Sequence, residues 1–143
     1  MTTPLDVAIR SGTAAHALLY RASRGRVAGR IGRLPLLLLE HTGARSGRRR
    51  VTPLGYVRDG ERIVLIASKG GHPRHPAWFH NLRAHPDATV QIGARRLAVH
   101  ARVADPQERA RLWPRVLEAH GGYAGYQRRT TREIPLVILE PGR

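Results

Sequence analysis

The pattern of apolar and polar residues, with the turn signals between them, predicts six short strands. The run LPLLLLEH (residues 34–41) is apolar almost throughout, as in a strand that is buried on both faces. Two pairs of further runs flank short turns and predict hairpins: residues 50–58 with 61–67, and residues 88–93 with 95–103. The turn of the first pair is Asp59-Gly60, a dipeptide strongly favoured in tight hairpins. The apolar run IPLVILE (residues 134–140) predicts the last strand.

Three helices are expected from helix-start signals. In residues 3–22, a threonine suited to the N-cap precedes a proline suited to the first helical position. A proline also opens a short predicted helix over residues 76–84. Asp105 and Glu108 have the spacing of a capping box, in which each side chain binds the backbone N–H of the other residue. The third helix therefore begins just after Asp105.

This order of elements, dominated by hairpins, predicts an α+β fold with a mainly antiparallel six-stranded sheet that closes into a small barrel. The 143 residues suffice for one hydrophobic core. We expect a single domain over residues 34–143, preceded over residues 1–33 by the first helix and a connector rich in glycine and arginine. No cysteine is present and no apolar run is long enough to cross a membrane, so we expect a cytoplasmic protein.

Charge narrows the choice of partners to anions. The formal net charge is +15, and only one of the 25 basic residues, Lys69, is a lysine. Such an excess indicates nucleic acid, acidic lipid or a polyanionic small molecule. A single phenylalanine and four tyrosines offer little surface for stacking on bases, and no nucleic-acid recognition motif is visible. Composition by itself leaves all three classes of partner open.

Three short segments carry residues suited to chemistry. In HTGARSGRRRVTPL (residues 41–54), four arginines surround glycine and serine, as in a loop that binds phosphate or carboxylate oxygens. In ASKGGHPRHPAWFHNL (residues 67–82), Lys69 and a glycine pair precede a helix start, which favours an anion pocket. In GGYAGYQRRTTREIPL (residues 121–136), Tyr123 and Tyr126 have the spacing of one helical turn and can stack on a planar ring.

Each segment also has a purely structural interpretation. The arginine loop can be a solvated hairpin, Trp78 can be a core residue, and the tyrosine pair can hold the C-terminal loop in place. Three histidines between residues 72 and 80 match no standard zinc spacing and have no cysteine or carboxylate nearby, so no metal site is expected.

Together and in this order, the segments resemble the deazaflavin-dependent nitroreductase family, whose members include quinone reductases that use reduced coenzyme F(420). The family pattern is approximately T-G-R-K-S-G-x-x-R-x-x-P-L, then A-S-K-G-G-x-x-x-x-P-x-W-x-x-N-L, then Y-x-x-Y-Q and finally I-P with an apolar run. This chain has TGARSGRRRVTPL, ASKGGHPRHPAWFHNL, YAGYQ and IPLVIL, and the likeness spans roughly residues 14–141. The second motif is the most specific of these.

The resemblance implies a split β-barrel like that of flavin-binding reductases, with coenzyme F(420) as the cofactor and FMN less expected. F(420) is an 8-hydroxy-5-deazaflavin with a phosphate and a glutamate tail, so it is a long polyanion. The resemblance implies that the following residues bind it: Arg45, Ser46, Gly47, Arg50, Pro53, Ser68, Lys69, Gly70, Gly71, Pro76, Trp78 and Asn81. Ala44 stands where many relatives have arginine, which weakens the tail contacts or leaves them to Arg48 and Arg49.

The implied reaction passes a hydride from reduced F(420) to a quinone, a nitro compound or a similar acceptor. Ser68, Tyr123 and Tyr126 are then the candidates to polarise the acceptor oxygen. A basic nucleic-acid-binding protein without catalytic activity remains the alternative. Weak contact of residues 1–33 with an acidic membrane surface is compatible with the enzyme hypothesis. The residues leave open the physiological acceptor, the oligomeric state and a choice of FMN or haem in place of F(420).

Overall fold

The computed structural model describes residues 30–31 and 34–142. The helix expected over residues 3–22 and most of the basic connector lie outside the described residues.

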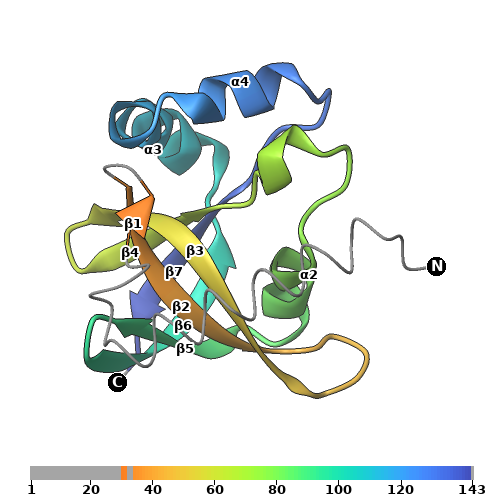
Figure 1. Cartoon of the computed structure of the whole chain (residues 1–143), viewed down its shortest axis with the longest axis vertical. Helices are drawn as coiled ribbons and strands as arrows, with labels where there is room; N and C mark the ends of the chain where they lie inside the picture. The colour runs from red at the N-terminus through yellow and green to blue at the C-terminus, as the bar shows by residue number, and fades with distance from the viewer. Residues whose placement is uncertain (1–29, 32–33, 143) are drawn as a thin grey trace.

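A closed antiparallel barrel forms the body of the protein (Figure 1). Its strands are β1 (Arg30–Ile31), β2 (Leu34–Thr42), β3 (Arg49–Asp59), β4 (Arg62–Ile66), β5 (Asp87–Ile92), β6 (Arg95–Val103) and β7 (Leu136–Pro141). They follow one another in the order β1-β2-β3-β4-β7-β6-β5, and β2 pairs with β5 as well as with β3. This second pairing closes β2 to β7 into a six-stranded barrel, which confirms the predicted α+β split-barrel class.

Both predicted hairpins are present, with small shifts at their ends. Asp59 pairs with Arg62, so the two loop residues of the β3–β4 hairpin are Gly60 and Glu61, one position later than the Asp59-Gly60 turn expected. Gly60 has a φ of +63°, in the left-handed region that glycine adopts without strain. The shift therefore still places the glycine where the turn needs it.

The described helices are η1 (Lys69–Gly71), α2 (Ala77–Ala84), α3 (Pro106–Ala119) and α4 (Gly122–Arg128). Helices α3 and α4 lie together at one end of the barrel, and α4 also contacts η1 (Figure 1). The capping box at Asp105 and Glu108 is formed as expected. Pro76 is the N-cap of α2, and α4 is a short helix that the apolar pattern does not predict.

The apolar runs of the strands contain few polar residues because both faces of the sheet are covered. On β4, Ile63 and Leu65 belong to the cluster that fills the barrel together with α2, while Val64 and Ile66 belong to a second cluster under α3 and α4. Side chains alternate between the two faces of a strand, so each run contributes to both clusters. The layer under α3 and α4 brings these helices against the end of β4, where η1 begins.

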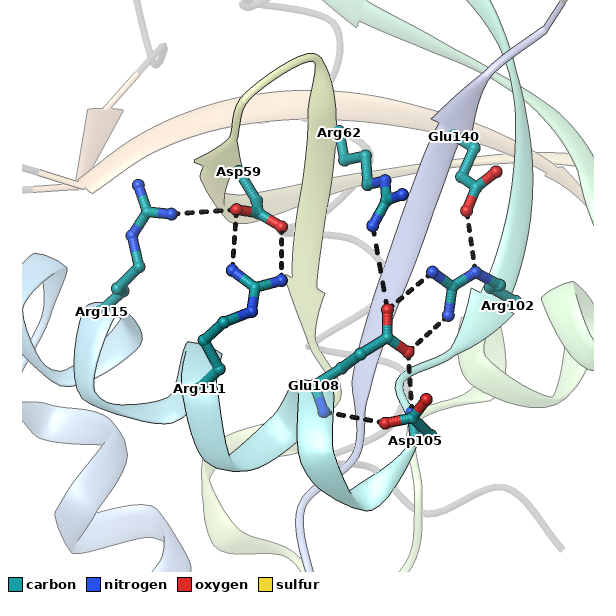
Figure 2. Close-up of polar contacts among 8 residues, drawn as sticks. All are labelled: Asp59, Arg62, Arg102, Asp105, Glu108, Arg111, Arg115 and Glu140. Carbon is teal, nitrogen blue, oxygen red and sulfur yellow. Dashed lines mark hydrogen bonds and ion pairs between the residues drawn. The ribbon is translucent and has the colours of Figure 1, made fainter.

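Ion pairs attach α3 to the strands (Figure 2). Arg102 on β6 donates two hydrogen bonds to Glu108 at 2.6 and 2.7 Å and one to Glu140 on β7 at 2.9 Å. On the next turns of α3, Arg111 and Arg115 both bind Asp59 at the end of β3. The hydrogen bonds from Arg102 lower the pKa of Glu108 to about 2. These contacts fix the orientation of α3 and hence the place of α4 beyond it.

Candidate active site

A cavity of about 360 Å³ opens between the mouth of the barrel, η1 and α4. It is lined by Leu34, Leu36, Pro53, Leu54, Gly55, Ile66, Ser68, Lys69, Pro76, Trp78, His120, Tyr123 and Tyr126. Strands β2 to β4 thus supply an apolar side, η1 supplies polar groups, and the aromatic rings come from α2, α4 and the end of α3. Such a mixture suits a planar, partly polar ligand.

The structure brings seven of the predicted site residues to this cavity. They are Pro53, Ser68, Lys69, Pro76, Trp78, Tyr123 and Tyr126. Trp78 is buried in the barrel cluster and lines the cavity too, so its core and site interpretations hold together. Sequence reasoning did not select the apolar lining residues or His120. Leu54 ends the first motif, and the others lie outside the three motifs.

The polar wall is the turn Ser68–Gly71, which follows β4 and includes η1. Gly71 N–H donates to the Ser68 carbonyl at 2.9 Å, and His72 N–H donates to the Lys69 carbonyl at 3.1 Å. Ser68 as a residue is buried, but its hydroxyl is not sealed off: it makes no hydrogen bond within residues 34–142, and Ser68 lines the cavity. Gly71 is required, because a Cβ there would lie 2.6 Å from the Tyr126 carbonyl oxygen and its φ is +81°.

Two tyrosines of α4 form the aromatic wall. The rings of Tyr123 and Tyr126 meet edge to face with centroids 5.7 Å apart, and His120 lies against Tyr123 in the same way at 5.2 Å. A Cβ added at Gly55 would clash with the Leu34 side chain and lie 3.2 Å from the Tyr123 hydroxyl, so that glycine leaves room for both. Burial, with a smaller effect of Tyr126, raises the pKa of Tyr123 to about 12. Tyr123 is therefore a neutral hydrogen-bond donor at physiological pH.

The predicted arginine loop joins β2 and β3 and projects from the barrel (Figure 1). Arg45, Ser46, Gly47 and Arg50 are exposed and do not line the cavity. Gly47 has a φ of +68°, and the Ser46 hydroxyl accepts a hydrogen bond from the Arg48 N–H at 3.2 Å. The loop is thus a defined turn that presents its arginine side chains to solvent.

The arginines of this loop are not equivalent. Arg49 binds the buried Glu40 carboxylate at 2.7 Å, and Arg96 from β6 binds the same oxygen at 2.6 Å. Within the described part of the chain, Arg45, Arg48 and Arg50 have no carboxylate partner. With respect to the described residues, these three therefore have a positive charge that an external anion can bind.

Asn81 connects α2 to the base of the loop instead of lining the cavity. Its Oδ1 accepts from the Ala44 N–H at 2.9 Å, which turns its Nδ2 towards His41 Nδ1 at 3.1 Å. The other nitrogen of His41 lies 2.9 Å from the Thr52 hydroxyl. Because Asn81 donates to Nδ1, the imidazole is neutral with its proton on Nε2. Burial, and then the charge of Arg50, lowers the pKa of His41 to about 4.

The donor set around the cavity fits the implied cofactor. Lys69 and the Ser68 hydroxyl suit phosphate or ring oxygens, and the aromatic wall suits a planar ring. Arg45, Arg48 and Arg50, which have no carboxylate partner among the described residues, suit an acidic tail. Arg50 is three residues from Pro53 along β3, so roughly 10 Å separate the loop from the cavity. An elongated polyanion can span that separation.

Comparisons with known proteins identify the family of the chain. The model of the F420H(2)-dependent quinone reductase family matches residues 13–141. An F420H(2)-dependent quinone reductase of Mycobacterium tuberculosis is 45% identical over 128 residues, which cover 87% of this chain and 86% of the relative.

Solved structures give the same result. One of an F420-H2 dependent reductase (FDR-A) is 41% identical with a TM-score of 0.69, and the match covers 74% of this chain and 94% of the other. A second structure, described as a domain-swapped dimer, is 34% identical with a TM-score of 0.70. The match covers 96% of this chain and 100% of the other. By sequence and by fold, the chain belongs to the F420H(2)-dependent quinone reductase family.

Proposed function

We propose that this protein reduces a quinone with reduced F(420) in the cavity between η1, α2 and α4. The observation that carries the proposal is the convergence of Ser68, Lys69, Trp78 and the tyrosine pair on one 360 Å³ space. These residues come from two separate motifs, and the fold brings them together. Residues 34–143 would form the cofactor-binding domain, and residues 1–33 would be an N-terminal helix and basic connector, of which Arg30–Ile31 pair with β2.

We assign cofactor binding to the turn Ser68–Gly71 and to the arginine loop. Lys69 would bind an anionic oxygen of the cofactor, and Arg45 and Arg50, which have no carboxylate partner within residues 34–142, would bind its acidic tail. Asn81 acts indirectly, because its hydrogen bonds to Ala44 and His41 hold the base of the loop. Ser46 and Gly47 shape the turn that carries the arginines.

When bound, reduced F(420) supplies the hydride. The chain supplies hydrogen-bond donors where negative charge develops on the acceptor oxygen. Ser68 has a hydroxyl without a partner among the described residues, and the Tyr123 phenol, whose pKa burial raises to about 12, is protonated at physiological pH. Tyr126 lies beside Tyr123 on the same wall. Donors that are fixed in place before the reaction stabilise the transition state more than mobile water does.

Nitro compounds are proposed as further acceptors, since a nitro group also develops negative charge on oxygen when it is reduced. We place the protein in the cytoplasm, with peripheral contact of residues 1–33 to acidic lipid, which the charge of +15 favours. No helix in the described ranges is long and apolar enough to cross a membrane. The nucleic-acid alternative draws on the same charge but has no support in the family match.

A ligand panel tests the proposal. F(420) should quench protein fluorescence at lower concentration than FMN, and oxidation of reduced F(420) should depend on added quinone. Duplex DNA should bind only weakly, with the steep salt dependence of non-specific phosphate contacts. Tight DNA binding at physiological salt, with no response to F(420), would be incompatible with the enzyme hypothesis.

A further inference from the structure

One arginine outside the predicted site organises the polar wall of the cavity. Arg132 lies in the segment between α4 and β7, and its guanidinium makes four hydrogen bonds. It donates to the carbonyls of Ser68 at 2.7 Å, His72 at 2.9 Å and Ala67 at 3.1 Å, and to His75 Nδ1 at 3.1 Å. A single side chain therefore holds both ends of the turn Ser68–Gly71.

All four acceptors of Arg132 are neutral groups. Within residues 34–142 the guanidinium has no carboxylate partner, although the neighbouring Arg109 has one in Glu133 at 3.0 Å. A positive charge that is half-buried without a counter-ion raises the electrostatic potential of its surroundings. Because Ser68 lines the cavity, this potential extends into the space where an anion would bind.

The turn that Arg132 holds has an unusual backbone. Lys69 has a φ of +46°, and it is the only residue other than glycine with a positive φ in the described ranges. The other positions of this kind are Gly47, Gly60, Gly71 and Gly93. A side chain in the left-handed region is strained, and such a conformation persists only where surrounding contacts determine it. The contacts of Arg132 on either side of Lys69 fulfil that condition.

We propose that Arg132 is a positioning residue of the cofactor site. It fixes the turn Ser68–Gly71 so that Lys69 faces the cavity, and its own uncompensated charge favours an anionic group of the cofactor bound there. This inference rests on the proposed function, because it takes F(420) as the anion. A purely structural role for Arg132 predicts instead that its variants lose stability but, once folded, bind F(420) as wild type does.

The test compares Arg132→Gln and Arg132→Lys with Arg109→Gln as the control. Arg109 is a suitable control because it also binds a backbone carbonyl of this segment, that of Ile134 at 3.1 Å, but its hydrogen bonds and ion pair go to Gln127, Glu133 and Ile134 and not to the turn. Affinity for oxidised F(420) is measured by fluorescence titration and stability by thermal unfolding without cofactor. Arg132→Gln should bind F(420) at least about tenfold more weakly than wild type. The affinity of Arg132→Lys should lie between those of wild type and Arg132→Gln, and Arg109→Gln should bind as wild type does.

His75 provides a readout that does not depend on activity. Its pKa lies below the ordinary range because of burial first and then the charge of Arg132, with smaller effects of His80 and Arg83. An anion bound near Arg132 should therefore raise the pKa of His75, followed by NMR of its ring protons during titration with F(420). In Arg132→Gln that rise should be much smaller.

The outcomes separate the two proposals. If wild type fails to bind F(420), the proposed function is wrong. If wild type binds and both Arg132 variants bind equally well, the positioning role is wrong and Arg132 is structural. If Arg132→Gln does not fold, the test rests on Arg132→Lys. The lysine keeps the positive charge but cannot make the four hydrogen bonds of the guanidinium. Wild-type affinity of Arg132→Lys for F(420) would show that Arg132 does not hold the turn.

Discussion

We expect the backbone strain at Lys69 to lower the free energy of unfolding, and its charge to strengthen ligand binding. Two substitutions can separate these effects. The residue is exposed at the cavity and adopts a φ of +46°. Lys69→Ala removes the charge and keeps the Cβ, and with it the strain. Lys69→Gly removes the charge and the strain together. Both variants should therefore lose cofactor affinity, but only Lys69→Gly should gain stability.

The left-handed conformation costs a residue with a Cβ roughly 1–2 kcal/mol, of which the added flexibility of glycine in the unfolded chain offsets part. We expect Lys69→Gly to be about 1 kcal/mol more stable than Lys69→Ala, or about 3 °C in Tm for a domain of this size. A charge-assisted hydrogen bond contributes about 1.5–3 kcal/mol, so both variants should bind F(420) roughly 10- to 100-fold more weakly.

Gly60→Ala measures the free-energy cost of a positive φ for a residue with a Cβ in the same fold. Gly60 has a φ of +63°, and a Cβ there would meet nothing within 4 Å, so the substitution adds strain without a clash. Urea unfolding without cofactor, together with F(420) titration, measures all three variants. Gly60→Ala should lose stability and bind normally. The reasoning is refuted if Gly60→Ala is destabilised while the two Lys69 variants are equally stable, or if either Lys69 variant binds F(420) as wild type does.

Three further predictions follow from the site. Arg50→Ala should weaken F(420) binding by about 1.5–3 kcal/mol in a titration and leave the Tm unchanged, whereas Arg49→Ala should lower the Tm because Glu40 loses a partner. Tyr126→Phe should lower kcat and kcat/KM together at unchanged F(420) affinity in steady-state assays; normal turnover in both Tyr126→Phe and Tyr126→Ala would make the tyrosine pair structural. With the pKa of His41 near 4, only the unfolded chain takes up its proton between pH 6.5 and 4. The free energy of unfolding should therefore fall by up to about 3 kcal/mol across that window, and His41→Gln should reduce the fall in urea titrations at pH 7 and 4.5.

The strands could be predicted because their signals are local. Each apolar run serves two cores, so it remains apolar without interruption, and the turn residues between runs mark the hairpins. Helix α4 escaped prediction because its sequence, GYAGYQR, contains two glycines, which disfavour a helix in isolation. Burial of Tyr123 and contact with η1 stabilise it instead, and both depend on the complete fold.

The site residues divide in the same way. Ser68, Lys69 and the tyrosines lie in short motifs, so sequence alone could select them. Asn81 lies in a motif as well, but its role of holding the loop at Ala44 requires a contact across 37 positions. Arg132 reaches Ser68 across 64 positions and looks like any other arginine of a basic chain. Contacts of this range are set by the closure of the barrel, which no local pattern shows.

The central claim is that the cavity between η1, α2 and α4 binds F(420). A crystal structure of the protein with oxidised F(420) tests it most directly. The account predicts the deazaflavin ring between Trp78 and the tyrosine pair, an anionic oxygen within hydrogen-bond distance of Lys69 Nζ, and the acidic tail running towards Arg50. A ring bound outside this cavity, or a tail directed away from the arginine loop, would contradict it.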